Sequence, residues 1–109
     1  MSSMPKAAGV SVTRMVELKR IFLRRSLEEL EALSAEISRA KDQSEEKCVE
    51  MARPVLHRIH GTGATLGLEI GRKAGELRSQ LRAAPMPKAL LLQSIRSLAV
   101  LLRGMLSNP

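Results

Sequence analysis

The residues best suited to chemistry in this 109-residue chain lie between Leu56 and Leu68, in the stretch LHRIHGTGATLGL. This stretch holds both histidines of the sequence, three of its seven glycines and no acidic residue. On a helix, His57 and Gly61 would lie on one face, one turn from each other. A neutral imidazole nitrogen is a nucleophile near neutral pH, and a glycine one turn away leaves room for a second molecule. The pattern therefore predicts an exposed His57 on a rigid helix, with one side left clear by the missing side chain of Gly61.

Four regions of helical periodicity must position this stretch, at about residues 12–40, 48–66, 69–83 and 88–106. The predicted fold class is all-α, an antiparallel up-down bundle of four helices joined by short loops. Phe22 is the only aromatic residue, so the core must be built from Leu, Ala, Met and Ile, which favours helices over strands.

The chain is long enough for one domain with a modest core. We expect a flexible N-terminal tail over residues 1–11, because this segment is small, polar and aperiodic, and a helical domain over residues 12–109. In the third region, Gly71 and Gly75 lie beside the apolar stripe and would let two helices pack closely. The core positions expected on the last three helices are Cys48, Ala52, Val55, Ile59 and Leu66; Ile70, Ala74, Leu77 and Leu81; and Leu91, Ile95, Leu98, Leu102 and Met105.

Three local features bear on where the helices begin and end. Ser26 with Glu29 fits a capping box that would divide the first helix, although the apolar stripe that runs through this point favours continuity or a kink. Asp42, three residues before Glu45, is the expected N-cap of the second helix. Pro54 either kinks that helix or begins it, and the sequence leaves both alternatives open.

The formal net charge of +7 is unevenly distributed. Arg14–Arg25 carries five basic residues and one acidic residue, Glu28–Glu50 three basic and eight acidic, and Arg53–Arg82 six basic and two acidic, which gives net charges of +4, −5 and +4. The histidine stretch therefore lies in a positive region that suits an acidic partner. An alternative function is nucleic-acid binding through Arg14–Arg25, with Phe22 to stack a base and a steep dependence on salt.

Several classes of protein do not fit the sequence. Cys48 is the only cysteine, so no internal disulfide is possible and a reducing compartment is expected. There is no uninterrupted apolar run of about 18 residues and no signal-peptide pattern, so we predict a cytoplasmic protein without a membrane segment. The chain has no phosphate-loop motif and is too short to hold a kinase ATP domain. His57 and His60 lack an obvious third ligand, so no metal site is predicted.

The histidine stretch resembles the motif of the histidine phosphotransfer (HPt) domain family. That motif is a histidine, any residue, a Leu or Ile, often a Lys, then a Gly, several small residues and a second Gly. The corresponding residues here are His57, Ile59, His60, Gly61 and Gly67. The following segment, EIGRKAGELRSQL, also resembles the next helix of the family. The resemblance extends over about residues 22–106, and its specific part is the segment 56–81.

The resemblance implies a fold and a site. The fold would be the up-down four-helix bundle of the HPt type, and His57 would be the phosphorylated residue. Gly61 would leave space for the phosphoryl group and the incoming receiver domain, and His60 stands where many members carry a lysine near the phosphate. Many members also place a polar residue on the next helix facing the histidine; Ser79 or Gln80 falls near that position here, and Gln80 is our expected supporting residue.

The resemblance also implies the partners. A stand-alone carrier would exchange phosphate with the aspartate of a response regulator receiver domain or of a hybrid histidine kinase, and Arg58 and Ala64 would lie on the docking surface. Such a carrier is not an enzyme with its own ATP site and needs no cofactor, because the receiver supplies the magnesium ion. We expect it to be a monomer. A histidine-kinase dimerisation helix is the nearest rival, but that family has an acidic residue directly after its histidine, where Arg58 stands here.

Overall fold

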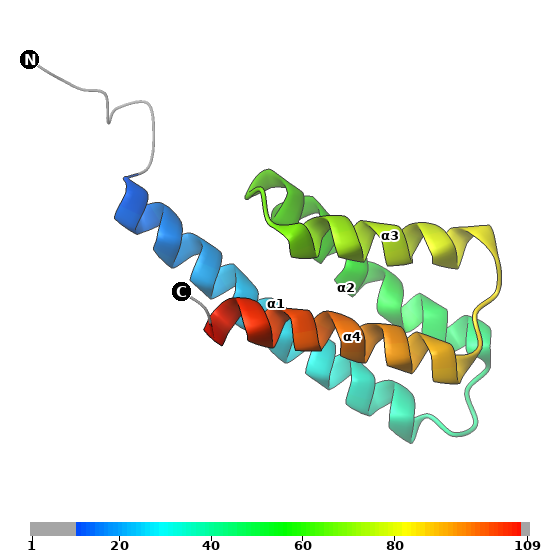
Figure 1. Cartoon of the computed structure of the whole chain (residues 1–109). Helices are drawn as coiled ribbons and strands as arrows, with labels where there is room; N and C mark the ends of the chain where they lie inside the picture. Colours follow the sequence, from blue (N-terminus) through cyan, green and yellow to red (C-terminus); the bar gives the residue numbers. More distant parts are fainter. Residues whose placement is uncertain (1–10, 108–109) are drawn as a thin grey trace, which may run out of the picture.

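The computed structural model describes residues 11–107, which form four α-helices and, within this range, no β-strand. The helices are α1 (Val12–Arg39), α2 (Glu45–Thr65), α3 (Glu69–Ala83) and α4 (Lys88–Ser107), as Figure 1 shows. The predicted all-helical chain with four helices is therefore confirmed over the described residues. The bounds of the third helix agree with the prediction at both ends.

α1 is one continuous helix that begins at a serine cap. The side chain of Ser11 accepts a hydrogen bond from the backbone N–H of Arg14 at 3.1 Å, so Ser11 belongs to the helix and not to the expected tail. The rest of that tail lies outside the described residues. The capping box at Ser26 and Glu29 is not formed: Ser26 is buried inside the helix, and Glu29 pairs with Arg58 of α2. The continuity favoured by the apolar stripe is confirmed.

α2 also begins at a serine cap, and the predicted cap was wrong. Ser44, not Asp42, accepts the backbone N–H of Lys47 at 3.1 Å. Pro54 lies inside the helix, which begins well before it, so the alternative of a helix that starts at Pro54 is excluded. The proline has no N–H to donate to the carbonyl of Glu50, and the tertiary packing of this helix must offset that loss.

The turn between α2 and α3 is a Schellman motif. Gly67 adopts a φ of +70°, a conformation that glycine takes without steric cost. Its N–H donates to the carbonyl of Ala64 at 3.0 Å, and the N–H of Leu68 donates to the carbonyl of Gly63 at 2.9 Å. The two bonds satisfy carbonyls that the end of a helix would otherwise leave free, and they return the chain directly into α3.

The core is built almost entirely from aliphatic side chains, as the composition predicts. All four expected core residues of α3 are buried; on α4, four of the five are buried and Met105 is partly buried against the core. On α2, Cys48, Ala52 and Ile59 are buried, whereas Val55 and Leu66 are partly buried. The largest side chains that are almost completely buried are Leu30, Ile37, Leu56, Ile59, Ile70, Leu91, Ile95 and Leu102.

The helices associate mainly as two pairs, α1 with α4 and α2 with α3 (Figure 1). Between α1 and α4, Arg103 donates a hydrogen bond to Glu31, and Lys88 Nζ donates to the carbonyl of Ala40 at 2.9 Å. These two contacts link α4 to the second half of α1 and to the residue that follows α1.

Backbone atoms of α2 and α3 come into direct contact at glycines. A Cβ on Gly63 would lie 2.7 Å from the Cα of Gly71, and a Cβ on Gly71 would lie 2.5 Å from the nitrogen of Ala64. Further along, a Cβ on Gly75 would lie 2.5 Å from Nδ1 of His60. No larger residue fits at the first two positions without a shift of backbone. The predicted close approach of two helices at Gly71 and Gly75 is thus confirmed, with α2 as the partner.

α4 is long and apolar enough to cross a membrane by length and composition, which the sequence analysis did not anticipate. One helix of this kind is only weak evidence for a membrane span, because the core helix of a soluble protein meets the same criteria of length and composition. In this chain α4 places Leu91, Ile95, Leu98, Ala99 and Leu102 in the core that it forms with the other helices.

Candidate functional site

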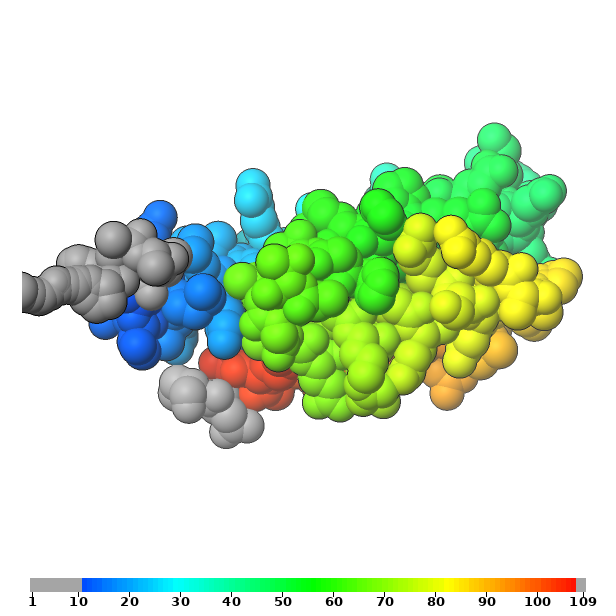
Figure 2. Space-filling model, turned by 90° about the horizontal axis from the view of Figure 1, so that it is seen from above, coloured from blue at the N-terminus to red at the C-terminus, as the bar shows by residue number. Residues whose placement is uncertain are grey.

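His57 lies exposed on α2, at the edge of a shallow hollow in the protein surface. The lining of this hollow comes entirely from one helix: His57, Arg58, Gly61, Thr62 and Thr65. His57, Gly61 and Thr65 are spaced four residues apart, so they form one row along the helix. The face of the molecule that α2 and α3 form is seen in Figure 2, where the first turns of α1 (blue) project beyond it.

Gly61 leaves open space next to His57. A Cβ built on Gly61 would meet no atom within 4 Å, and the residue is exposed. The hydroxyl of Thr65 donates a hydrogen bond to the carbonyl of Gly61 at 3.0 Å, and this bond stabilises the helix next to the glycine. A group that approaches His57 therefore meets backbone rather than a side chain one turn away. This is the geometry that the sequence predicts for the pair.

The side chain of His60 packs against α3. Its Nδ1 lies 2.9 Å from the carbonyl oxygen of Gly71, and because a carbonyl can only accept, Nδ1 carries the proton that is donated. The ring also lies against Gly75, where a Cβ would be 2.7 Å from Cε1. The residue is half-buried. His60 thus joins α2 to α3, a structural role that the sequence analysis did not foresee.

Arg58 forms an ion pair with Glu29, which links α2 to α1. Partial burial lowers the pKa of the guanidinium from its ordinary value, and the nearby charge of Arg25 lowers it further. Arg58 also lines the hollow beside His57. The expected docking residue is therefore a cation that α1 already holds in place at the edge of the hollow.

The other predicted site residues are exposed. Ala64 lies on α2 and Gln80 on α3. Gly75 faces α2 through its contact with His60. Ser79, one turn further along, lies on nearly the same side of α3, whereas Gln80 is rotated about 140° from Gly75. Of the two alternatives for the polar residue facing the histidine, helix geometry places Ser79, and not Gln80, on the side of α3 toward α2.

Two contributors to the site were missed by the sequence analysis. They are Thr65 and Glu29. Thr65 is four residues after Gly61, and this spacing could have predicted that the two residues share one face of the helix. Nothing in the sequence pairs Glu29 with Arg58, because the contact depends on how α1 packs against α2. Among the described residues, no group of three or more His, Cys, Asp or Glu side chains is gathered in a way that could hold a metal ion.

The comparisons with known proteins add no relatives. No family model matches the chain, and neither a curated protein nor a solved structure is similar to it at a significant level.

Proposed function

We propose that this protein is a phosphoryl carrier of the HPt type in a two-component phosphorelay, with His57 as the phosphoacceptor. The observation that carries the proposal is the exposed imidazole of His57 beside the open space at Gly61. The motif resemblance from His57 to Gly67 supports it independently of the geometry. An exposed histidine by itself would have little weight, because most surface histidines have no special role.

The proposed fold is the antiparallel up-down bundle of the HPt type. The contacts of Gly63 with Gly71 and of His60 with Gly75 support it, because residue numbers rise on α2 as they fall on α3. The contact of Arg103 with Glu31 in the α1/α4 pair fits the same topology. Such a bundle presents one helix surface to each partner in turn.

The proposed chemistry is a reversible phosphoryl transfer between the imidazole and a carboxylate. An imidazole nitrogen of His57 attacks the phosphorus of a receiver's aspartyl phosphate; the N–P bond forms as the acyl O–P bond breaks, and the aspartate carboxylate leaves. The phosphorylated ring then loses a proton to solvent. Such a transfer depends on in-line placement and charge stabilisation. The open space at Gly61 allows the approach, and the magnesium ion belongs to the receiver.

The partners follow from this chemistry. They are a response regulator receiver domain and, as donor, a second receiver or a hybrid histidine kinase. The proposed carrier acts with them in the cytoplasm and is a monomer. The carrier needs neither nucleotide nor cofactor for the reaction. Arg58 would contact the receiver from the edge of the hollow, and Ala64 on α2 and Ser79 on the side of α3 toward α2 would border the docking surface.

The direct test is incubation with a receiver labelled at its aspartate, comparing the wild type with His57→Gln. The expected result is an acid-labile, alkali-stable label on the wild type and none on His57→Gln. His60→Asn is the matched control, because the asparagine amide can still donate to the Gly71 carbonyl; it should keep the label. Label that persists in His57→Gln would exclude His57 as the acceptor.

A second test concerns the open space at Gly61. Gly61→Gln should leave the helical spectrum intact and severely reduce phosphate uptake, because its side chain would enter the approach path to His57. Gly61→Ala should fold with an unchanged or raised melting temperature, since alanine is favoured by about 0.5–1 kcal/mol over glycine in a helix. Uptake by Gly61→Gln at the wild-type rate would show that this glycine does not guard the site.

A further inference from the structure

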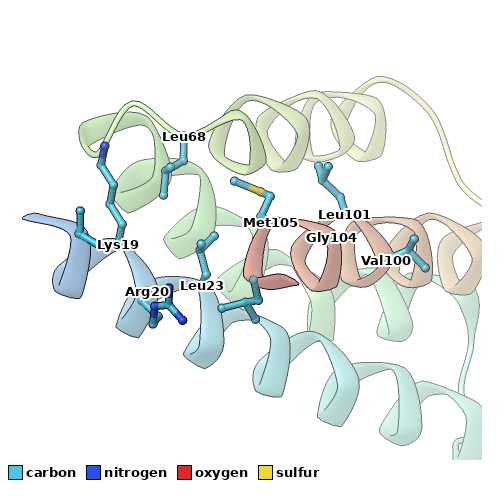
Figure 3. Close-up of a pocket in the computed structure, with 10 residues that line it drawn as sticks. Lys19, Arg20, Leu23, Leu68, Val100, Leu101, Gly104 and Met105 are labelled. Atoms are coloured by element: carbon cyan, nitrogen blue, oxygen red, sulfur yellow. The ribbon is translucent and has the colours of Figure 1, made fainter. Parts of the chain in front are cut away.

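An apolar groove opens at the end of the molecule where α1 and α4 diverge. It has a volume of about 680 Å³. Its walls come from three parts of the chain: Val16 and Leu23 on α1, Leu68 in the turn before α3, and Leu101 and Met105 on α4 (Figure 3). Leu23 is buried, whereas Leu68, Leu101 and Met105 are only partly covered. Among the described residues, no side chain fills this groove.

The apolar surface continues from the groove along the exposed start of α1. The first turns of α1 extend past the end of α4 (Figure 1). On these turns Val12 is 82% exposed and Val16 is 53% exposed, and across the groove Val100 of α4 is 63% exposed. Contiguous exposed apolar surface of this kind marks interaction sites in soluble proteins, whereas single exposed residues do not.

Charge at the groove is of one sign. Lys19 and Arg20 line it, and no acidic residue does. Within residues 11–107 neither of these two side chains forms an ion pair. Glu17, on the same helix, pairs with Arg14 at 3.8 Å, and Glu69, which follows Leu68, pairs with Arg72 at 3.2 Å. An occupant of this groove would therefore gain from carrying carboxylates next to its apolar side chains.

The concave shape of the groove favours a helix over a flat surface as the apolar partner. A concave site between two helices accepts a ridge of side chains, as in the recognition of amphipathic helices by hydrophobic grooves. On the wall formed by α4, a Cβ built on Gly104 would meet no atom within 4 Å, so an incoming backbone can approach this part of the helix closely. A flat bilayer surface would not fill the hollow. A second copy would bring two basic α1 segments together, which is electrostatically unfavourable.

We propose that this groove binds an amphipathic helix of a partner protein, with apolar side chains inserted between α1 and α4 and carboxylates facing Lys19 and Arg20. The groove and the His57 hollow share no lining residue. The inference does not depend on the proposed phosphotransfer, and it gives the protein a second surface for protein contact.

The probe for this site is a labelled synthetic peptide of about 16 residues, roughly 24 Å long as a helix, with Leu at positions i, i+3, i+4 and i+7 and Glu on its flanks. Binding to the full chain is followed by fluorescence anisotropy. A scrambled peptide of the same composition is the control for net charge. The designed peptide should bind, and the scrambled peptide should bind at least about tenfold more weakly.

Two variants of the protein locate the contact. Gly104→Leu places a side chain in the groove and should weaken the peptide by about tenfold. Lys19→Glu with Arg20→Glu should weaken it by about fivefold and remove most of its dependence on salt. Lys41→Glu with Lys47→Glu changes the net charge equally at exposed positions outside the groove and should have little effect. His57→Gln should bind the peptide as the wild type does, even if no phosphate uptake is found.

Several results would overturn the proposal. They are no binding of the designed peptide at millimolar concentration, equal binding of the scrambled peptide, and unchanged binding by Gly104→Leu. Sedimentation that shows a dimer broken by Gly104→Leu would identify a second copy as the occupant. Preferential binding of anionic vesicles or of DNA that Lys19→Glu with Arg20→Glu removes, without peptide binding, would assign this surface to a lipid or a nucleic acid instead.

Discussion

The two helix pairs of this molecule are held together in different ways. In the α2/α3 pair, Gly63 and Gly71 bring the two backbones into contact, and His60 crosses the interface to a carbonyl of α3. In the α1/α4 pair, leucine and isoleucine side chains form the interface, with an exposed ion pair between Arg103 and Glu31 along its edge. The first pair leaves little freedom for the helices to shift, whereas the second widens at one end into the apolar groove.

Under the proposed functions, the two pairs would serve different uses. Backbone contact fixes the position of α2, which carries the exposed His57, and such a rigid support would suit the proposed phosphoryl transfer, because that reaction requires one geometry. The α1/α4 pair can tolerate an open end because other buried side chains, Ile37 and Leu91 among them, lie further along the two helices. Glycine also differs between the pairs: Gly71 is packed, whereas Gly104 borders open space.

The largest effect is expected from loss of a buried leucine in the α1/α4 pair. Leu102 is fully buried, so Leu102→Ala should lower the free energy of unfolding by about 2–5 kcal/mol, measured by urea denaturation. The neighbouring Val100 is 63% exposed, and Val100→Ala should change stability by less than about 0.5 kcal/mol. A cost for Leu102→Ala as small as that of Val100→Ala would show that hydrocarbon burial does not hold this pair together.

A smaller but more diagnostic effect is expected at the glycine contact of α2 and α3. The Cβ of Gly71→Ala would lie 2.5–2.9 Å from backbone atoms of α2, so the helices must separate, at a cost of about 1–3 kcal/mol. Gly104→Ala is the matched control: its Cβ meets open space, and the substitution should stabilise the protein by about 0.4–1 kcal/mol. The same urea titration measures both. Equal stabilisation by the two alanines would refute backbone contact at Gly71.

The contact of His60 with Gly75 should be worth less, because a side chain can move where a backbone cannot. Gly75→Ala displaces the imidazole and weakens its hydrogen bond to the Gly71 carbonyl, at a cost of about 0.5–1.5 kcal/mol. A double-mutant cycle with His60→Ala measures the coupling. Once the ring is absent, Gly75→Ala should cost nothing; additive costs in the cycle would mean that the two residues do not interact.

The elements of this fold could be predicted from sequence because periodicity and turn chemistry act locally. The core residues of α3 and the end of that helix before Pro85 follow from spacing alone. The N-cap of α2 was assigned to Asp42 instead of Ser44, because several short polar residues in one loop are equally able to cap. The site was predicted in part: the open face of His57 and Gly61 follows from helical spacing.

What could not be predicted depends on contacts between distant segments. The motif places His60 where many members carry a lysine, but nothing in the sequence shows that its ring is held by residues of α3, which only the packing brings near. The partner of Arg58 is 29 residues away on α1, and that of Arg103 is 72 residues away. Opposite charges are common along this chain, so nothing in the sequence selects these pairs from the many that are possible.

The smallest difference between the two helix pairs is expected at the ion pairs of Arg103 and Arg58. The Arg103–Glu31 pair is about half exposed, so Glu31→Gln should cost less than about 0.5 kcal/mol, and added salt should remove that cost. The Arg58–Glu29 pair is more buried, and Glu29→Gln should cost about 1 kcal/mol, since it leaves a partly desolvated guanidinium without its carboxylate. Urea denaturation at low and high salt separates the two. A larger loss for Glu31→Gln would place the stronger electrostatic link in the α1/α4 pair rather than beside His57.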